Sequence, residues 1–141
     1  MKRVLVINGP NLNMLGKRPK EHYGSLTLEE INYAIEKENN GYFSLEFFQS
    51  NCEGELITRL QGALEYAAIL INPASYTHTS IGLRDALEMC SGIKIEIHLS
   101  KVDEREPFRR VNLIRDVVDR TFAGKQVESY LEAIQYLKTV L

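Results

Sequence analysis

Two histidines are the side chains of this sequence best suited to acid–base chemistry or ligand binding. His78 lies in the polar stretch Asn72–Ser80, N-P-A-S-Y-T-H-T-S, and His98 ends the alternating run I-K-I-E-I-H. Imidazole titrates near neutral pH, so histidines that meet in one site can move protons or bind a ligand. Arg18 and Tyr23 share a segment that also contains glycine and proline.

A metal site is the weaker interpretation of the two histidines. Three or more ligands would have to converge, and Asp85 and Glu96 match no metal-ligand spacing. For either histidine alone, a structural role is the ordinary alternative. Glu96 precedes His98 by two residues, which places both side chains on one face of a strand. A carboxylate in that place can orient the imidazole and favour its protonated form.

The hydrophobic pattern predicts strands and helices in alternation, which is typical of an α/β domain with a parallel sheet. Thr27 and Glu30 form a capping-box pattern for one helix, and Thr79 is the expected N-cap of another. Segment 111–123 fits a helix as well as a strand. Strands are expected at 4–7, 42–49, 68–71 and 93–98, and helices at 28–40, 53–66, 80–90 and 127–141. We expect one domain over residues 1–141, with a doubly wound sheet of about five strands between two helix layers.

Polar stretches follow four of the predicted strands, at 8–13, 49–55, 72–80 and 98–100. Ligands of parallel sheets bind outside the carboxyl ends of the strands. These stretches therefore predict a single site. Segment 9–24 has no clear helical or strand period, and loops of this length are often functional lids. Arg18 and Tyr23 would lie on that lid.

Composition narrows the classes of ligand. Seventeen basic and nineteen acidic residues give a net charge of -2, so nothing in the charge balance favours nucleic acid or an anionic membrane. The stretch Asn8–Asn13 has one glycine and no dinucleotide or P-loop pattern.

Nothing in the sequence indicates secretion. Two cysteines form no disulfide framework, and the first apolar run is too short for a signal peptide. The expectation is a cytoplasmic protein that acts on a small molecule.

Several motifs, taken in order, resemble type II 3-dehydroquinate dehydratase. Each motif is weakly specific alone, but together they span most of the chain as far as Arg109. They are N-G-P-N-L-N-M-L-G at 8–16, R-P-K-E-H-Y-G at 18–24, Q-S-N-C-E-G-E at 49–55, N-P-A-S-Y-T-H-T-S at 72–80, L-R-D-A at 83–86, I-E-I-H-L-S at 95–100 and R-E-P-F-R at 105–109.

The resemblance implies a flavodoxin-like fold and a lyase that needs no cofactor and no metal. The family interconverts 3-dehydroquinate and 3-dehydroshikimate in the shikimate pathway of aromatic amino acid biosynthesis, through an enolate. Tyr23 would be the base, Arg18 its charged neighbour, His98 the acid, and Asn11 the amide that steadies the enolate through water. The implied substrate-binding set is Asn72, His78, Asp85, the backbone of Leu99 and Ser100, and Arg109.

The resemblance also implies a homododecamer built from trimers, in which Asp85 reaches the site of an adjacent subunit. Two departures from the family stand out. Lys101 replaces a common asparagine, and segment 111–124 is bulkier and more charged than the usual glycine-rich strand. Arg120 in that segment would need an acidic partner if it were buried, such as Asp116, Asp119 or Glu128 of the same or a neighbouring chain.

Two questions stay open at this point. Arg105, Arg109 and Arg110 are solvated surface charges by default, although one of them could bind an anionic substrate. A non-catalytic ligand-binding or signalling domain of flavodoxin-like fold would also explain the polar loops. That alternative does not explain an arginine and a tyrosine together on a lid.

Overall fold

The computed structural model describes all residues from Met1 to Leu141. Its centre is a five-stranded, wholly parallel sheet with the strand order β2-β1-β3-β4-β5. The strands are β1 Arg3–Asn8, β2 Ser44–Gln49, β3 Ala68–Asn72, β4 Ile93–His98 and β5 Arg120–Ala123. The α-helices are α1 Lys20–Tyr23, α2 Leu28–Asn39, α3 Glu53–Gln61, α4 Ile81–Met89 and α5 Val127–Val140.

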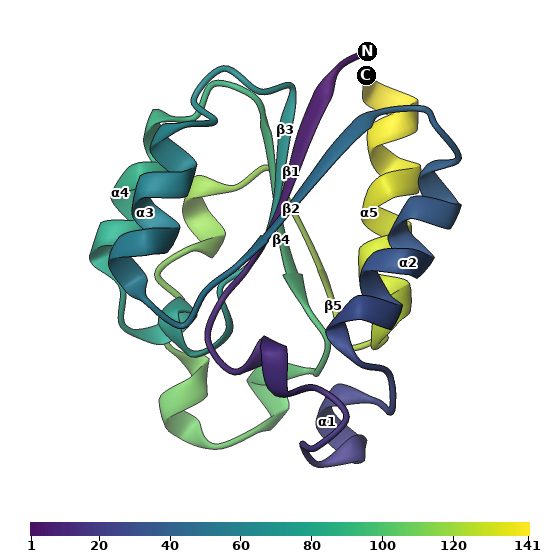
Figure 1. Cartoon of the computed structure of the whole chain (residues 1–141). Coiled ribbons are helices and arrows are strands. Elements are labelled where there is room, and N and C mark those ends of the chain that lie inside the picture. Colours follow the sequence, from purple (N-terminus) through teal and green to yellow (C-terminus); the bar gives the residue numbers. More distant parts are fainter.

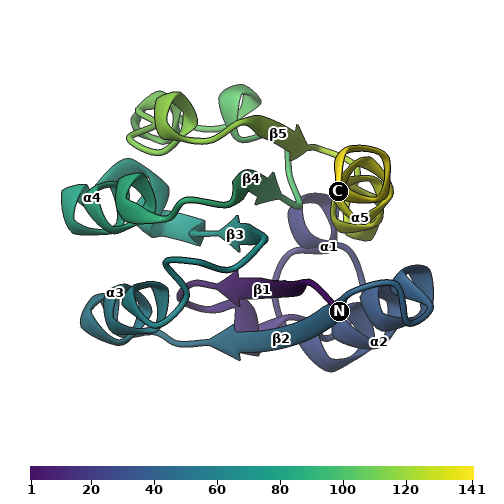
Figure 2. The same cartoon turned by 90° about the horizontal axis from the view of Figure 1, so that it is seen from above.

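Two helix layers enclose this sheet, with α2 and α5 on one face and α3 and α4 on the other (Figures 1 and 2). In β1, Val4 and Val6 belong to the core under α2 and α5, while Leu5 and Ile7 belong to the core under α3 and α4. A strand buried on both faces is mostly apolar, which is why the short apolar runs were informative. The flavodoxin-like, doubly wound fold expected from the sequence is confirmed.

The strand register brings the polar loops to one edge of the sheet. Asn8, the last residue of β1, lies opposite Gln49 of β2 and Asn72 of β3. On the other side, His98 at the end of β4 lies opposite Ala123 of β5. The carboxyl ends of four strands therefore supply side chains to the same region.

Helix caps agree with the sequence in one case and differ in another. The Thr27 hydroxyl accepts a bond from the Glu30 amide at 3.2 Å, and the Glu30 carboxylate accepts one from the Thr27 amide at 3.0 Å. The expected Thr79 cap is wrong, because the hydroxyl of Ser80 accepts from the Leu83 amide at 2.9 Å instead. Helix α3 is also shorter than expected and ends at Gln61.

The two segments without a clear sequence pattern are built from short elements. The lid contains a 3-10 turn at Leu12–Met14 and the one-turn helix α1, which ends at Gly24 with φ of 77°. The ambiguous segment 111–123 contains a 3-10 turn at Arg115–Val117 and then β5. Elements of three or four residues are too short to show a hydrophobic period.

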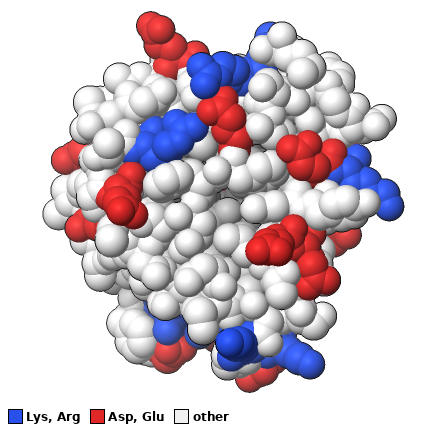
Figure 3. Space-filling view, in the orientation of Figure 1, with Lys and Arg blue, Asp and Glu red and all other residues white.

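Charges of both signs are interspersed on the face seen in Figure 3. Arg120 is exposed, and its guanidinium lies over the Tyr136 ring at 4.6 Å. The acidic partner expected for Arg120 is therefore not needed within the chain, and Asp116 pairs with Arg84 instead. None of the helices combines the length and the apolar character that crossing a membrane requires.

Candidate active site

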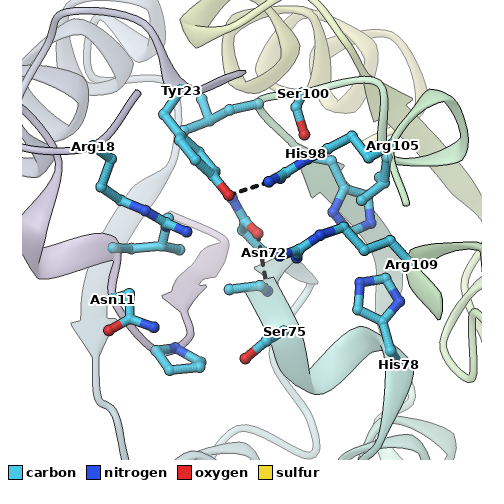
Figure 4. A pocket seen from close by; sticks show the side chains of 15 residues that line it. Asn11, Arg18, Tyr23, Asn72, Ser75, His78, His98, Ser100, Arg105 and Arg109 are labelled. Carbon is cyan, nitrogen blue, oxygen red and sulfur yellow. Dashed lines mark hydrogen bonds between the residues drawn. The ribbon is translucent and has the colours of Figure 1, made fainter. Parts of the chain in front are cut away.

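A cavity of about 120 Å³ lies at the carboxyl edge of the sheet, between the strand ends and the lid (Figure 4). The site residues expected from the sequence line this cavity, except Asp85. They are Asn11, Arg18, Tyr23, Asn72, His78, His98, Leu99, Ser100 and Arg109. Asp85 is exposed on α4 and does not reach the cavity of its own chain.

The tyrosine of the lid is surrounded by two guanidinium groups. Nη1 of Arg105 donates a hydrogen bond to the Tyr23 hydroxyl at 2.7 Å (Figure 4). The guanidinium carbon of Arg18 lies 3.6 Å from the centre of the Tyr23 ring. Arg18 is thus adjacent to Tyr23, as expected, but a different arginine contacts the phenolic oxygen.

His98 is hydrogen-bonded to Glu96, the residue two positions earlier on β4. Its Nε2 lies 2.6 Å from Oε2 of Glu96, whose side chain is fully buried. Burial alone opposes ionisation of this carboxyl, but hydrogen bonds from His98, Asn112 and Thr121 outweigh it and lower the pKa of Glu96 to about 2. An ionised carboxylate only accepts, so Nε2 of His98 carries the proton and Nδ1 is left for the cavity.

The second histidine is held by backbone rather than by a carboxylate. Nδ1 of His78 donates to the carbonyl of Val111 at 2.6 Å, which leaves Nε2 for a ligand. Val111 belongs to the segment that departs from the family pattern. The two histidines therefore differ in their environment, because His98 is bonded to a carboxylate and His78 to a backbone carbonyl.

Asn72 is fixed by bonds on both sides of its amide. Its Oδ1 accepts from the Ala74 amide at 3.1 Å, and its Nδ2 donates to the Tyr130 hydroxyl at 3.0 Å. The Tyr130 hydroxyl in turn donates to Oδ1 of Asn8 at 2.5 Å. Complete burial raises the pKa of Tyr130, so this residue is a neutral donor and acceptor. The chain of bonds joins β1, β3 and α5 beneath the cavity.

The loop after β1 comes unusually close to the loop after β3. A Cβ atom on Gly9 would lie 2.5 Å from the carbonyl oxygen of Pro73, so only glycine fits there. Two residues later, Asn11 has φ of 69°, a left-handed conformation that asparagine tolerates. The backbone amide of Asn11 donates to Oδ1 of Asn51 at 2.9 Å, which holds this turn in place. Its side chain lines the cavity (Figure 4).

Three arginines give the cavity a positive charge. Partial burial, together with the nearby charges of Arg105 and Arg109, lowers the pKa of Arg18. Arg109 is itself paired with Glu106, with Nε and Oε2 3.0 Å apart. The carboxylate of Glu96 is bonded to His98 and does not pair with any of the three cavity arginines. Such a cluster suits an anionic ligand, especially a carboxylate that accepts forked hydrogen bonds.

Sequence reasoning did not assign two polar side chains of the cavity, Arg105 and Ser75, to the site. Four apolar residues, Pro10, Leu12, Ala74 and Val102, also line it. Arg105 was one of three arginines in a charged run, and such runs are normally solvated. Its side chain is only 11% exposed here. Ser75 was part of a quoted polar stretch, but nothing in the stretch singled it out from its hydroxyl-bearing neighbours.

The fold and the cavity define a flavodoxin-like α/β protein with arginines, histidines and a tyrosine gathered in one cavity at the carboxyl edge of its sheet. The family described as "Dehydroquinase class II" matches residues 2–138. The 3-dehydroquinate dehydratase of Thermotoga petrophila is 44% identical over 142 residues, covering 99% of this chain and 96% of that protein. The enzyme of the same name from Haemophilus influenzae is 45% identical, covering 96% and 95%.

Solved structures agree with the sequence comparison. The type II dehydroquinase of Butyrivibrio crossotus superposes with a TM-score of 0.93 at 39% identity and covers 97% of each chain. That of Propionibacterium acnes gives 0.92 at 30% identity, covering 99% of this chain and 97% of the other. The chain belongs to the type II dehydroquinase family.

Proposed function

We propose that this protein is a hydro-lyase that converts 3-dehydroquinate to 3-dehydroshikimate and water, in the shikimate pathway. The observation that carries the proposal is the presence of two activated groups in one cavity. Tyr23 is surrounded by arginines, and His98 is bonded to a buried carboxylate. A base and an acid are what loss of water from a β-hydroxy ketone requires.

Tyr23, as phenolate, removes the proton alpha to the ketone. A neutral phenol is a poor base, so the anion has to be stabilised. A unit positive charge about 4 Å from an anion contributes about 4 kcal/mol at an effective dielectric of about 20. Arg105 and Arg18 supply two such charges, at the oxygen and over the ring. Closure of the lid also excludes water, which strengthens both interactions.

The electrons of the broken C–H bond form an enolate, and its oxygen needs a donor. Asn11 supplies the amide, acting through a water molecule as the family resemblance implies. His98, protonated on both nitrogens, gives its Nδ1 proton to the leaving hydroxyl. The C–O bond breaks with its electrons going to oxygen, and water departs. His98 is left neutral, with the Nε2 proton still bonded to Glu96.

Substrate binding falls to groups around these two. Arg109 binds the substrate carboxylate, together with the backbone of Leu99 and Ser100. His78 and Asn72 bind the ring hydroxyls, for which their fixed orientations are suitable. Tyr23 and His98 then act on opposite faces of the ring. We assign no cofactor and no metal ion to the reaction.

We also propose a cytoplasmic homo-oligomer built from trimers, with four trimers as its full assembly. Asp85 supports this, because it is exposed and lies outside the cavity of its own chain. In an adjacent subunit it would contribute a carboxylate that the isolated site lacks. The closed assembly is consistent with the symmetry that most homo-oligomers adopt.

Ultraviolet absorbance tests the proposed reaction directly, because the product is a conjugated enone and the substrate is not. The purified protein should convert 3-dehydroquinate without added metal or cofactor. Tyr23→Phe is the matched control, since it removes one oxygen and should abolish most turnover while substrate still binds. Binding of 3-dehydroquinate without any conversion by the unaltered protein would point to a non-catalytic binding domain and overturn the proposal.

A further inference from the structure

The buried carboxylate of Glu96 has two oxygens with separate sets of donors. Oε2 accepts from Nε2 of His98 at 2.6 Å and from Nδ2 of Asn112 at 2.7 Å. Oε1 accepts from the Thr121 hydroxyl at 2.8 Å and faces Nε of Arg115 at 3.4 Å. The carboxylate therefore has contacts that would be lost if it rotated about its last side-chain bond.

Backbone structure fixes two of these donors. Thr121 lies opposite Glu96 in the register of β4 and β5, so the fifth strand places its hydroxyl at the carboxylate. Asn112 accepts from the amides of Ile114 and Arg115 at 2.8 and 2.9 Å through its Oδ1. That arrangement leaves Nδ2 of Asn112 directed at Glu96. Both anchors come from the segment that departs most from the family pattern.

We infer that Thr121 and Asn112 are positioning residues for the acid step, and that Arg115 adjusts the strength of the acid. The inference rests on the proposed function and adds to it a use for segment 111–124. None of the three touches the substrate cavity. They act through Glu96, which determines how His98 presents its ring to the cavity.

The chemical reason is the choice of tautomer. While Glu96 is fixed and ionised, neutral His98 keeps its proton on Nε2, and Nδ1 is the nitrogen that exchanges protons in the cavity. Loss of the Thr121 donor leaves Oε1 with a single distant contact. The carboxylate can then turn, its bond to Nε2 weakens, and the tautomer with the proton on Nδ1 becomes populated. In that tautomer Nδ1 of His98 already carries the single proton, so it cannot take up the proton that restores the acid after each turnover.

Arg115 acts by charge and in a defined direction. Its guanidinium faces Glu96 and, through Nη1, Asp103 at 3.4 Å. Asp103 is exposed, so it neutralises the arginine only in part. A positive charge near the pair of His98 and Glu96 disfavours the protonated imidazole. Removing it should keep the acid protonated to higher pH, which moves the alkaline limb of the kcat profile upward.

The first experiment compares Thr121→Val with Thr121→Ser. Valine keeps the shape and removes the donor, and should lower kcat by about tenfold with KM changed by less than about twofold. Serine keeps the hydroxyl and should restore most of kcat. Nitrogen-15 NMR of the His98 ring should show one tautomer in the unaltered protein and in Thr121→Ser, and a mixture in Thr121→Val. Full kcat with one tautomer in Thr121→Val would overturn the positioning role.

The second experiment remains informative if Thr121→Val does not fold. Arg115→Met changes a partly exposed residue, and should move the alkaline limb upward by about half a pH unit. Arg120→Met is the matched control, because Arg120 lies in the same segment, is exposed and does not contact Glu96. An unchanged limb in Arg115→Met, or an equal shift in Arg120→Met, would refute the charge effect. Failure of the proposed reaction would appear separately, as no turnover in the unaltered protein, while the NMR comparison would still decide the tautomer.

Discussion

Nη1 of Arg105 donates a hydrogen bond to the Tyr23 hydroxyl across 82 positions of sequence, at a distance of 2.7 Å. Arg18, only five positions from Tyr23, lies over the ring face instead. The two arginines therefore contact different parts of the phenol. Arg105 orients the oxygen, whereas Arg18 lies against the ring and adds a second positive charge.

Arg105→Met should lower kcat at neutral pH and move the acidic limb of the pH–rate profile upward by about one pH unit, because the phenolate loses its direct donor. Arg18→Met should move the same limb in the same direction by less, because its charge lies over the ring. Rates measured across the pH range give both limbs. Arg110→Met is the matched control, since Arg110 is exposed and does not line the cavity. An acidic limb that stays in place in Arg105→Met would contradict the stabilisation of the phenolate.

Variants of the two histidines should differ in which steady-state constant they change. His98→Asn removes the acid and should lower kcat by about a hundredfold, with a small effect on KM. His78→Asn removes a binding group and should mainly raise KM. Isothermal titration calorimetry with 3-dehydroquinate then tests whether binding weakens in His78→Asn and stays unchanged in the nearly inactive His98→Asn. The reverse pattern would mean that the roles are exchanged.

Acid should destabilise the protein through Glu96. Its folded pKa of about 2 lies below the ordinary 4.5, so its stabilisation is complete above pH 4.5 and is lost as pH falls toward 2. Over that range the free energy of unfolding should fall by about 3 kcal/mol from this group alone. Denaturant unfolding of Glu96→Gln should show a correspondingly smaller dependence on pH between 4.5 and 2. An identical pH dependence in both proteins would contradict the low pKa.

Mixing two inactive variants tests whether Asp85 acts in a neighbouring subunit. Asp85→Asn and Tyr23→Phe chains, unfolded together and refolded, should form some sites with an intact tyrosine and an intact aspartate from different chains. Activity should then exceed that of either variant refolded alone. The control mixture is Tyr23→Phe with His98→Asn, whose defects lie in the cavity of one chain, and it should regain nothing. Sedimentation equilibrium supplies the size, and a fully active monomer would rule out the shared site.

The sequence was most informative where burial dictates residue type. Strand β4 has the bounds expected from its alternation, and the capping box of α2 formed as its pattern required. Glu96 and His98 could be paired in advance because alternation on a strand is geometric. The same reasoning located the loops of the site, since all parallel strands end at one edge.

Local sequence patterns were least informative where neighbouring residues carry the same functional group, because the pattern does not show which of them makes the contact. Thr79 and Ser80 both carry a hydroxyl, and only the backbone path shows that Ser80 caps α4. Arg105 could not be separated from Arg109 and Arg110, because a charged run is solvated unless the fold brings a partner to it. The donors to Glu96 on segment 111–124 were hidden for the same reason. Their partner lies on another strand, and the register that joins them is a tertiary property.

The buried hydroxyl of Tyr130 has a consequence for how ligand occupancy can be measured. It links Asn72 of the cavity floor to the first turns of α5 on the outer layer. A ligand that binds Asn72 should add to the bonds that already hold this residue, and should thereby suppress local openings that let amide protons of α5 exchange with solvent. Deuterium uptake in that helix should therefore fall when the cavity is filled, whether or not the ligand is turned over.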